Sequence, residues 1–475
     1  MVIPAEIPNL IGGEARPAAG GAWLDKHRPA DGTLLCRVAG SGPEDVDAAV
    51  AAARAAQPAW AAQTVVARGD LLRELALALR ERREEASAIV AEETGKPLEL
   101  ALGETDAAVE MGLFVAGEGR RFYGRTTSAS TPHRTVLTMR HPVGVAGLIV
   151  SFNTPLPNVA WKAFPALLCG NAAVLKPSEE APASAWLFGE LAREVGLAPG
   201  LLNVVHGAGP EAGAALVEHE GVDLVSFTGS AATGRIVNER AGARLAKVCL
   251  ELGGKNALVV CDDADLESAV RRSVASAFSN AGQRCAAASR LVVFDSIADA
   301  FRERLLAEAR ALEPQPVISE AALQRILRQL DGAVARGASI ACGGVRLDRP
   351  GFHLAPTIVE GVGPEDDLSC TELFGPVATL STVRGLDEAI ALVNDSPYGL
   401  TAAVHTASLH RALRFAEEVE VGVVVVNAGT HGSEPHMGFG GVKQSGTGWK
   451  EAGVEALDVY SDVRWVNLVA DPSLT

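Results

Sequence analysis

The sequence lacks the features of a membrane, secreted or nucleic-acid-binding protein. Its longest apolar runs, residues 143–150 and 421–426, are far shorter than the ~18–20 residues that a membrane helix needs. The first ten residues hold no basic patch before an apolar stretch, so no signal peptide is predicted. Lys and Arg number 42 against 58 Asp and Glu, whereas nucleic-acid binding needs clustered cations. We expect neither a membrane nor a nucleic acid as a partner.

Cysteine is scarce and scattered. The seven cysteines include no CxxC pair, which argues against a disulfide framework or a zinc site and predicts no bound metal. This usage is typical of a reducing cytoplasm. Hydrophobic residues make up 48% and charged residues 21% of the chain, which excludes a disordered protein. A length of 475 residues predicts about three domains.

Strand-like and helix-like segments alternate along the chain, which indicates an α/β protein. Residues 43–100 have a helical pattern. Further on, continuous apolar runs typical of buried parallel strands alternate with helical patterns. The expected strands are residues 145–150, 172–175, 201–205, 222–227 and 247–250, and the expected helices are 158–168, 182–195 and 210–219. This order predicts a doubly wound sheet, which binds ligands at the carboxyl ends of its strands. Strands 290–294, 377–380 and 422–426, with helix 297–312, predict a second α/β domain.

Two motifs at predicted strand ends could bind a nucleotide. Residues 228–234 form a glycine-containing turn that opens a helix, where main-chain amides can face a phosphate. An ordinary strand-to-helix turn explains the same pattern. Lys176 and Glu179 follow another strand and could bind phosphate and ribose hydroxyls, or form a solvated surface pair.

Two other motifs carry reactive side chains. Cys285 lies among small residues directly after Arg284, and a neighbouring cation favours the thiolate. For an isolated cysteine, a buried bystander is the simpler interpretation. Glu251 is expected to end a strand beside two glycines, where it could act as a general base or stay a solvated carboxylate.

Taken together and in order, these motifs resemble those of the aldehyde dehydrogenase family over nearly the whole chain. The matching segments are residues 30–60, 93–97 (ETGKP), 151–155 (SFNTP), 170–179 (GNAAVLKPSE), 227–230 (FTGS), 251–255 (ELGGK), 282–285 (GQRC), 372–376 (ELFGP) and 439–446 (FGGVKQSG). The resemblance implies a Rossmann-like NAD-binding domain (1–123 and 143–251), an α/β catalytic domain (252–443) and a small β oligomerisation element (124–142 and 444–475). It also implies a homodimer or homotetramer.

The resemblance implies NAD-dependent oxidation of an aldehyde to the carboxylic acid. Cys285 matches the family nucleophile, which forms a thiohemiacetal and then a thioester. Asn153 matches the donor to the oxyanion. Glu251 matches the general base that activates water, and Lys162 and Glu451 match positions that relay its proton.

NAD is expected over NADP because a carboxylate at Glu179 would repel the additional phosphate. The residues that the resemblance places around the cofactor are Ser151, Phe152, Lys176, Ser178, Glu179, Gly229, Ser230, Gly234, Leu252, Glu372 and Phe374.

Arg284 indicates the charge of the substrate, because a cation beside the nucleophile can bind a carboxylate, phosphate or phosphonate. The hypothesis is a short anionic aldehyde. The alternative is that Arg284 turns outward to a structural carboxylate and that the substrate is a neutral aliphatic or aromatic aldehyde. The residues expected to line the substrate tunnel are Arg284, Thr154, Trp161, His431, Ser433 and Phe439, with His436 near its mouth.

Two alternative functions are compatible with the same fold. A CoA-acylating relative typically lacks a glutamate at the position of Glu251, because water activated by that base would compete with CoA. A non-catalytic relative would be expected to have lost a catalytic residue, whereas Cys285, Glu251 and Asn153 are all present.

Overall fold

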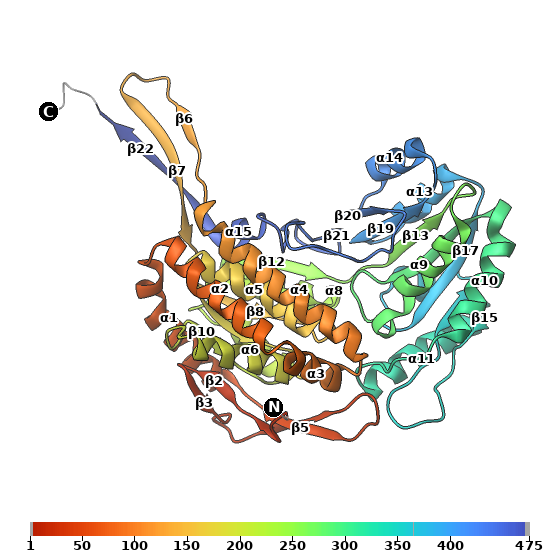
Figure 1. The fold of residues 1–475 in the computed structure, drawn as a ribbon, viewed down its shortest axis with the longest axis horizontal. Coiled ribbons are helices and arrows are strands. Elements are labelled where there is room, and N and C mark those ends of the chain that lie inside the picture. The colour runs from red at the N-terminus through yellow and green to blue at the C-terminus, as the bar shows by residue number, and fades with distance from the viewer. Residues whose placement is uncertain (1–2, 364, 471–475) are drawn as a thin grey trace.

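The computed structural model describes residues 3–363 and 365–470 and contains two lobes and a projecting arm (Figure 1). The predicted domain ranges include residues 1–2, 364 and 471–475, which lie outside the described residues. The first lobe is built on a sheet in the order β12-β11-β8-β9-β10-β2-β3. Its strands are β2 (Asn9–Ile11), β3 (Glu14–Arg16), β8 (Val145–Ile149), β9 (Ala172–Lys176), β10 (Leu202–Val204), β11 (Leu224–Gly229) and β12 (Lys247–Leu252).

Five strands of this sheet are parallel and form the expected doubly wound unit. In chain order they are arranged 3-2-1-4-5, so the winding direction reverses between β8 and β11. All five residues of β8 and of β9 are buried, as the continuous apolar runs predict. The carboxyl ends of β8 and β11 therefore border the crevice where such sheets bind their ligands.

Helices cover both faces of this sheet. They are α1 (Pro43–Ala61), α2 (Val65–Glu81), α3 (Arg83–Thr94), α4 (Leu98–Gly117), α5 (Pro155–Leu168), α6 (Pro182–Glu194), α7 (Ala214–Glu218) and α8 (Ala231–Ala243). Helices α2, α4 and α5 lie side by side (Figure 1). At Gly112 of α4, an added Cβ would lie 2.5 Å from the Phe164 ring of α5. Glycine thus permits the close approach of α4 to the helix that carries Lys162.

The second lobe contains a sheet in the order β15-β16-β17-β14-β13-β19-β20. Its strands are β13 (Asn256–Val260), β14 (Ala288–Phe294), β15 (Ser339–Cys342), β16 (Thr357–Glu360), β17 (Val377–Val383), β19 (Thr401–His405) and β20 (Val423–Val426). Its helices are α9 (Leu266–Phe278), α10 (Ala298–Ala311), α11 (Glu320–Ala335), α13 (Leu386–Asn394) and α14 (Leu409–Glu418). The second predicted α/β unit is present.

The arm is a three-stranded antiparallel sheet of β6 (Thr126–Ser128), β7 (Arg134–Pro142) and β22 (Ser461–Val469), with β22 at one edge. It projects from the first lobe (Figure 1). Segments far apart in the sequence therefore pair in the arm. Among the described residues, no helix is both long and apolar enough to cross a membrane.

Three local predictions were wrong. Strand β11 continues to Gly229 and α8 begins at Ala231, so Gly234 lies inside a helix and not in a turn. Strand β12 continues through Glu251 to Leu252, because residues beyond the expected strand end still pair with β11. The helix expected at residues 210–219 is a π-turn at Gly209–Gly213 followed by the short α7.

Candidate active site

Cys285 lies on a strained loop between α9 and β14. Asn280, Ala281 and Gly282 have φ angles of 55°, 52° and 67°, a left-handed conformation that costs non-glycine residues about 1–3 kcal/mol each. Side chains hold this loop in place. Asn280 Nδ2 donates to the main-chain oxygens of Asn153 (3.1 Å) and Gln283 (3.3 Å). The loop of the predicted nucleophile is thereby joined directly to the predicted oxyanion residue.

The Cys285 thiol is protonated in this resting arrangement. Burial, then the charges of Glu372 and Glu251, raise its pKa to about 12, and Arg284 opposes this only weakly. Arg284 lowers the pKa of the thiol, as expected, but desolvation outweighs the neighbouring cation. The thiol needs a base to become nucleophilic at neutral pH.

Glu251 is the predicted base, and its surroundings suit this role. It is 4% exposed, and neither carboxylate oxygen has a hydrogen-bond partner among the described residues. Burial first and the Glu451 charge second raise its pKa well above the ordinary value, with Lys162 opposing. An added Cβ at Gly440 would lie 2.6 Å from Glu251 Oε1, so the glycine leaves room for the carboxylate. A buried, unpaired carboxylate with a raised pKa suits proton abstraction.

Lys162 and Glu451 form a buried ion pair behind Glu251. Lys162 Nζ donates to Ser226 Oγ (2.7 Å), and Ser226 Oγ donates to Glu451 Oε1 (2.6 Å). Glu451 is positioned by main-chain hydrogen bonds with Phe439. The three polar groups satisfy one another, as buried charges require. The structure brings these two predicted relay residues together within electrostatic range of Glu251.

Asn153 follows β8 at the point where the sheet reverses its winding. Its main-chain oxygen accepts hydrogen bonds from Lys96 Nζ (2.7 Å) and from Asn280. Lys96 in turn donates to both carboxylate oxygens of Glu104, each at 2.6 Å. The backbone of Asn153 is thus fixed from two sides.

Several predicted cofactor residues border the same crevice. Ser151 and Phe152 follow β8, and Ser230 follows β11 and caps α8 by accepting from Thr233 N at 3.2 Å. Lys176 and Glu179, after β9, form an ion pair of 3.2 Å, with the Glu179 side chain 41% exposed. A helix N-terminus at the switch point and a lysine at the end of the neighbouring strand β9 suit phosphate groups, so these residues fit a dinucleotide.

Gly234, Ser178 and Leu252 also make structural contacts, and their place at the cofactor stays a prediction. An added Cβ at Gly234 would lie 2.5 Å from Leu252 Cδ2, so these two residues form the contact between α8 and β12. Ser178 Oγ accepts from Glu180 N at 3.2 Å. Gly229 ends β11 beside Ser230 and keeps its position at the crevice.

Glu372 and Phe374 lie near the cysteine loop. Gly254 N donates to Glu372 Oε1 at 3.3 Å, and burial raises the Glu372 pKa to about 7. The Phe374 ring packs edge-on against Phe152, with centroids 5.6 Å apart. A carboxylate and an aromatic pair between the switch point and Cys285 fit a ribose and a planar ring.

Arg284 is neither turned outward nor tightly paired. Its side chain is 19% exposed and its Nη2 lies 3.8 Å from Glu104 Oε1, beyond hydrogen-bonding distance. Its Nε is buried without a partner among the described residues. Because Arg284 lies beyond hydrogen-bonding distance of Glu104, it keeps free donors among the described residues. The Lys96–Glu104–Arg284 cluster carries a net positive charge.

The other predicted substrate residues are dispersed around this cluster. Trp161 packs against Phe439, with ring centroids 5.4 Å apart, and both contact the cysteine region. His431 Nε2 lies 3.4 Å from Ser279 Oγ, and burial and Arg284 lower the His431 pKa. Thr154 occupies the N-cap of α5 without a side-chain cap bond. Ser433 is half-buried, and His436 is exposed beside Glu434.

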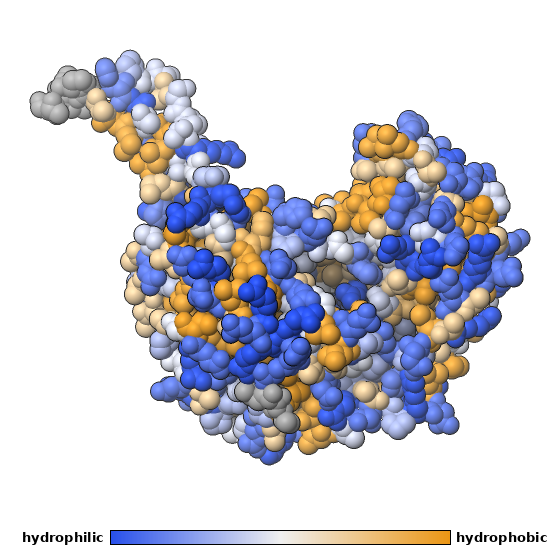
Figure 2. Space-filling view, viewed as in Figure 1, coloured by the Kyte–Doolittle hydropathy of each residue, from blue (hydrophilic) through white to orange (hydrophobic). Residues whose placement is uncertain are grey.

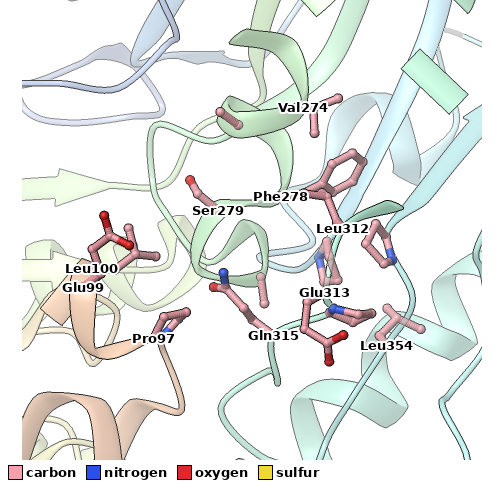
Figure 3. Close-up of a pocket in the computed structure, with 15 residues that line it drawn as sticks. Pro97, Glu99, Leu100, Val274, Phe278, Ser279, Leu312, Glu313, Gln315 and Leu354 are labelled. Atoms are coloured by element: carbon pink, nitrogen blue, oxygen red, sulfur yellow. The ribbon is translucent and has the colours of Figure 1, made fainter. Parts of the chain in front are cut away.

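A groove of about 280 Å³ lies on the Ser279 side of the cysteine loop (Figure 3). Pro97 and Leu100 form one wall, and Phe278 and Leu312 belong to the other. It contains none of the predicted catalytic residues. By contrast, Arg284, Glu372 and Phe374 share the lining of a cavity of about 10 Å³. The described residues include no cluster of His, Cys, Asp or Glu suited to a metal ion.

Sequence reasoning missed the residues that hold the site in place. These are Lys96, Glu104, Asn158, Asn256, Asn280 and Gln283. Lys96 and Gln283 stand in the motifs ETGKP and GQRC, but their partners are distant in sequence. Asn256 Nδ2, for example, donates to Cys285 O at 2.7 Å.

The comparisons agree with this geometry. The family model described as "Aldehyde dehydrogenase family" matches residues 16–466 of this chain. The chain belongs to the aldehyde dehydrogenase family. The expected family, fold and reaction class, oxidation of an aldehyde, are thereby confirmed.

Similar aldehyde dehydrogenases differ in the aldehydes for which they are named. Alpha-ketoglutaric semialdehyde dehydrogenase of Bacillus subtilis is 36% identical, over 96% of this chain and 97% of its own. Benzaldehyde dehydrogenase of Antirrhinum majus is 37% identical, over 96% and 88%. A crystal structure of betaine aldehyde dehydrogenase from Staphylococcus aureus with NAD+ is 33% identical and covers 98% and 95%, with a TM-score of 0.96. Because these names refer to different aldehydes, they do not identify the substrate of this chain.

Proposed function

We propose that this aldehyde dehydrogenase uses NAD to oxidise a short anionic aldehyde to its acid, with Cys285 as the nucleophile. The observation that supports this chemistry is the proximity of three groups. The Cys285 loop is bonded to Asn153 through Asn280 (3.1 Å), and Cys285 lies within electrostatic range of the unpaired Glu251.

In the proposed mechanism, Glu251 accepts the thiol proton and Cys285 Sγ attacks the aldehyde carbon. Asn153 Nδ2 donates to the carbonyl oxygen as negative charge develops there. NAD, when bound, supplies the hydride acceptor that turns the thiohemiacetal into a thioester. Glu251 passes the thiol proton through the Lys162–Glu451 pair to solvent and is again a carboxylate. It then accepts a proton from the water whose oxygen bonds to the thioester carbon. The C–S bond breaks, the acid is released and the Cys285 thiolate is regenerated. Water is the proposed acyl acceptor because the Glu251 carboxylate is free to activate it.

The residues proposed to hold NAD are Ser151, Phe152, Lys176, Ser178, Glu179, Gly229, Ser230, Gly234, Leu252, Glu372 and Phe374. Glu179 is the residue proposed to disfavour NADP. Residues 1–123 with 143–251 are proposed as the NAD-binding domain, 252–443 as the catalytic domain, and 124–142 with 444–475 as the oligomerisation element. We also propose a cytoplasmic location, because a reducing compartment keeps the Cys285 thiol free.

The substrate class rests on Arg284. Its free donors and the net positive charge of the Lys96–Glu104–Arg284 cluster favour a carboxylate, phosphate or phosphonate on the aldehyde. NADH formation without CoA should be measured with anionic and neutral aldehydes of equal length, with NAD and with NADP. We expect the highest kcat/KM with NAD and an anionic aldehyde.

Arg284→Met should remove this preference. Loss of a charge-assisted contact is expected to lower kcat/KM for the preferred anionic aldehyde about 10- to 100-fold. The value for the neutral aldehyde should stay within about threefold, since its contacts do not use the cation. Arg302→Met, which breaks a surface pair with Glu360, is the control. An unchanged anionic-to-neutral ratio would exclude the anion-binding role while leaving the dehydrogenase chemistry intact.

The arm is the proposed contact with further copies of the chain. Strand β22 is a nine-residue edge strand with exposed apolar side chains, including Val463 (52%), Trp465 (58%) and Leu468 (49%). Figure 2 shows apolar residues gathered on this arm. Edge strands of this kind pair with other chains, which favours a homodimer or homotetramer.

Trp465→Lys should therefore lower the oligomeric state. A charge at the centre of the exposed strand would have to be desolvated on pairing. Light scattering coupled to gel filtration is expected to show a smaller assembly than the parent protein forms. Leu409→Lys on α14, where Leu409 is 74% exposed, should leave the mass unchanged. Equal masses for the parent and Trp465→Lys would contradict the proposal.

A further inference from the structure

We propose that Asn158 is a positioning residue that fixes which end of the Asn153 side chain faces the substrate. This inference rests on the proposed function, in which Asn153 Nδ2 donates to the carbonyl oxygen. Asn158 is not among the residues assigned a role in the chemistry above. It lies in the first turn of α5, where its main-chain N donates to Thr154 O at 3.0 Å.

The Asn158 side chain joins two acceptors. Its Nδ2 donates to the main-chain oxygen of Ser151 and to Oδ1 of Asn153, both at 3.3 Å. Both asparagines are largely shielded from solvent, with Asn153 6% and Asn158 8% exposed. Water therefore competes little for these bonds.

The polarity of this arrangement is directional. An asparagine carboxamide has a donor end and an acceptor end of nearly equal shape, and its orientation follows from its hydrogen bonds. The Ser151 carbonyl can only accept, so Asn158 must present Nδ2 to it. The same Nδ2 then requires an acceptor from Asn153, which turns Asn153 Oδ1 inward. Asn153 Nδ2 is left without an acceptor among the described residues and free for the oxyanion.

The alternative orientation of Asn153 would oppose two NH2 groups in a buried place, which is unfavourable. The Asn153 backbone cannot shift easily to relieve this, because Lys96 and Asn280 hold its main-chain oxygen at 2.7 and 3.1 Å. Asn158 thus orients the donor to the oxyanion before the substrate binds. Donors that are oriented in advance stabilise the oxyanion without any reorganisation during the reaction.

Asn158→Asp tests this directly, because the shape is kept while both side-chain oxygens now accept. The introduced carboxylate should draw Asn153 Nδ2 toward itself and away from the carbonyl oxygen. We expect kcat to fall about 100-fold, with KM within about threefold. As the pH falls, protonation of the carboxylate restores a donor, so the ratio of variant to parent kcat should rise. A purely structural role would not produce this pH dependence.

Asn158→Leu removes the donor without recruiting Asn153 Nδ2, and a smaller loss of about tenfold in kcat is expected. The matched control is Asn203→Asp. Asn203 is also buried and its Nδ2 donates to two main-chain carbonyls, Gly200 O and Ala173 O. That variant should lower the melting temperature but leave kcat of the folded enzyme and its pH profile unchanged.

The outcomes separate this inference from the function on which it rests. If Asn153→Ala loses kcat while Asn158→Asp and Asn158→Leu stay within threefold of the parent, Asn158 has no positioning role. If Asn153→Ala itself keeps full kcat, the proposed role of Asn153 is wrong. Should Asn158→Asp fail to fold, the kcat of Asn158→Leu decides.

Discussion

Replacing Cys285 with alanine is expected to abolish aldehyde oxidation, with kcat lowered by about 10⁴-fold or more. No other described cysteine can substitute. Cys36, Cys169, Cys249, Cys261 and Cys342 are buried, and Cys370 lies elsewhere in the second lobe. Steady-state NADH formation with the preferred aldehyde measures the loss.

Cys370→Ala is the matched control, since Cys370 is the only other cysteine among the described residues that is not buried. Its activity should equal that of the parent. Thiol alkylation adds a pH test. Because the Cys285 pKa is raised to about 12, its reaction with iodoacetamide should accelerate as the pH rises through the alkaline range. Substantial turnover by Cys285→Ala would contradict the thioester mechanism.

Glu251→Gln should separate the two halves of the reaction. The amide cannot deprotonate water, so steady-state turnover is expected to fall about 10²- to 10⁴-fold. At high pH, where the thiol ionises without help, the first turnover should persist. A rapid-mixing experiment should then show a burst of about one NADH per subunit, followed by slow release of the acyl group.

The pH profile of the parent enzyme provides a second readout. A base acts in its deprotonated form, and burial together with Glu451 raises the Glu251 pKa well above the ordinary value. Activity should therefore be lost as the pH falls through this raised pKa, at a higher pH than an ordinary carboxylate would give. This limb should disappear in Glu251→Gln. If the variant retains the acidic limb of the profile unchanged, that limb reports the titration of another group. Glu372, with a pKa of about 7, would then be the next residue to replace.

The sequence predicts the first sheet well because its parallel strands are buried on both faces. Continuous apolar runs as short as β8 and β9 are typical of buried parallel strands, because buried helices are longer. The ends of elements were harder to place. Glu251 looked like the residue after a strand, yet β12 continues through it, since backbone pairing with β11 does not depend on the polarity of the side chain.

The site was predictable where motifs carry the chemistry and unpredictable where distant residues support it. Lys162 and Glu451 were identified through the resemblance, and the structure places them in one ion pair. The bond from Asn280 to Asn153 and the Lys96–Glu104 pair depend on a loop and a helix that meet only after folding. Arg284 shows the same limit, because its environment is set by Glu104, a residue that no local pattern distinguishes.

The ion pair of Lys162 with Glu451 also bears on how the protein is made. Lys162 lies in α5, whereas the carboxylate that pairs with it, Glu451, comes 289 residues later in the chain. Until the segment that carries Glu451 has left the ribosome, the nascent first lobe would hold a buried ammonium without its counter-ion, which is strongly unfavourable. The reactive cysteine is synthesised much earlier. Its surroundings can therefore be completed only after the segment that carries Glu451 has been made, so a nascent chain that ends before this segment would not oxidise aldehydes.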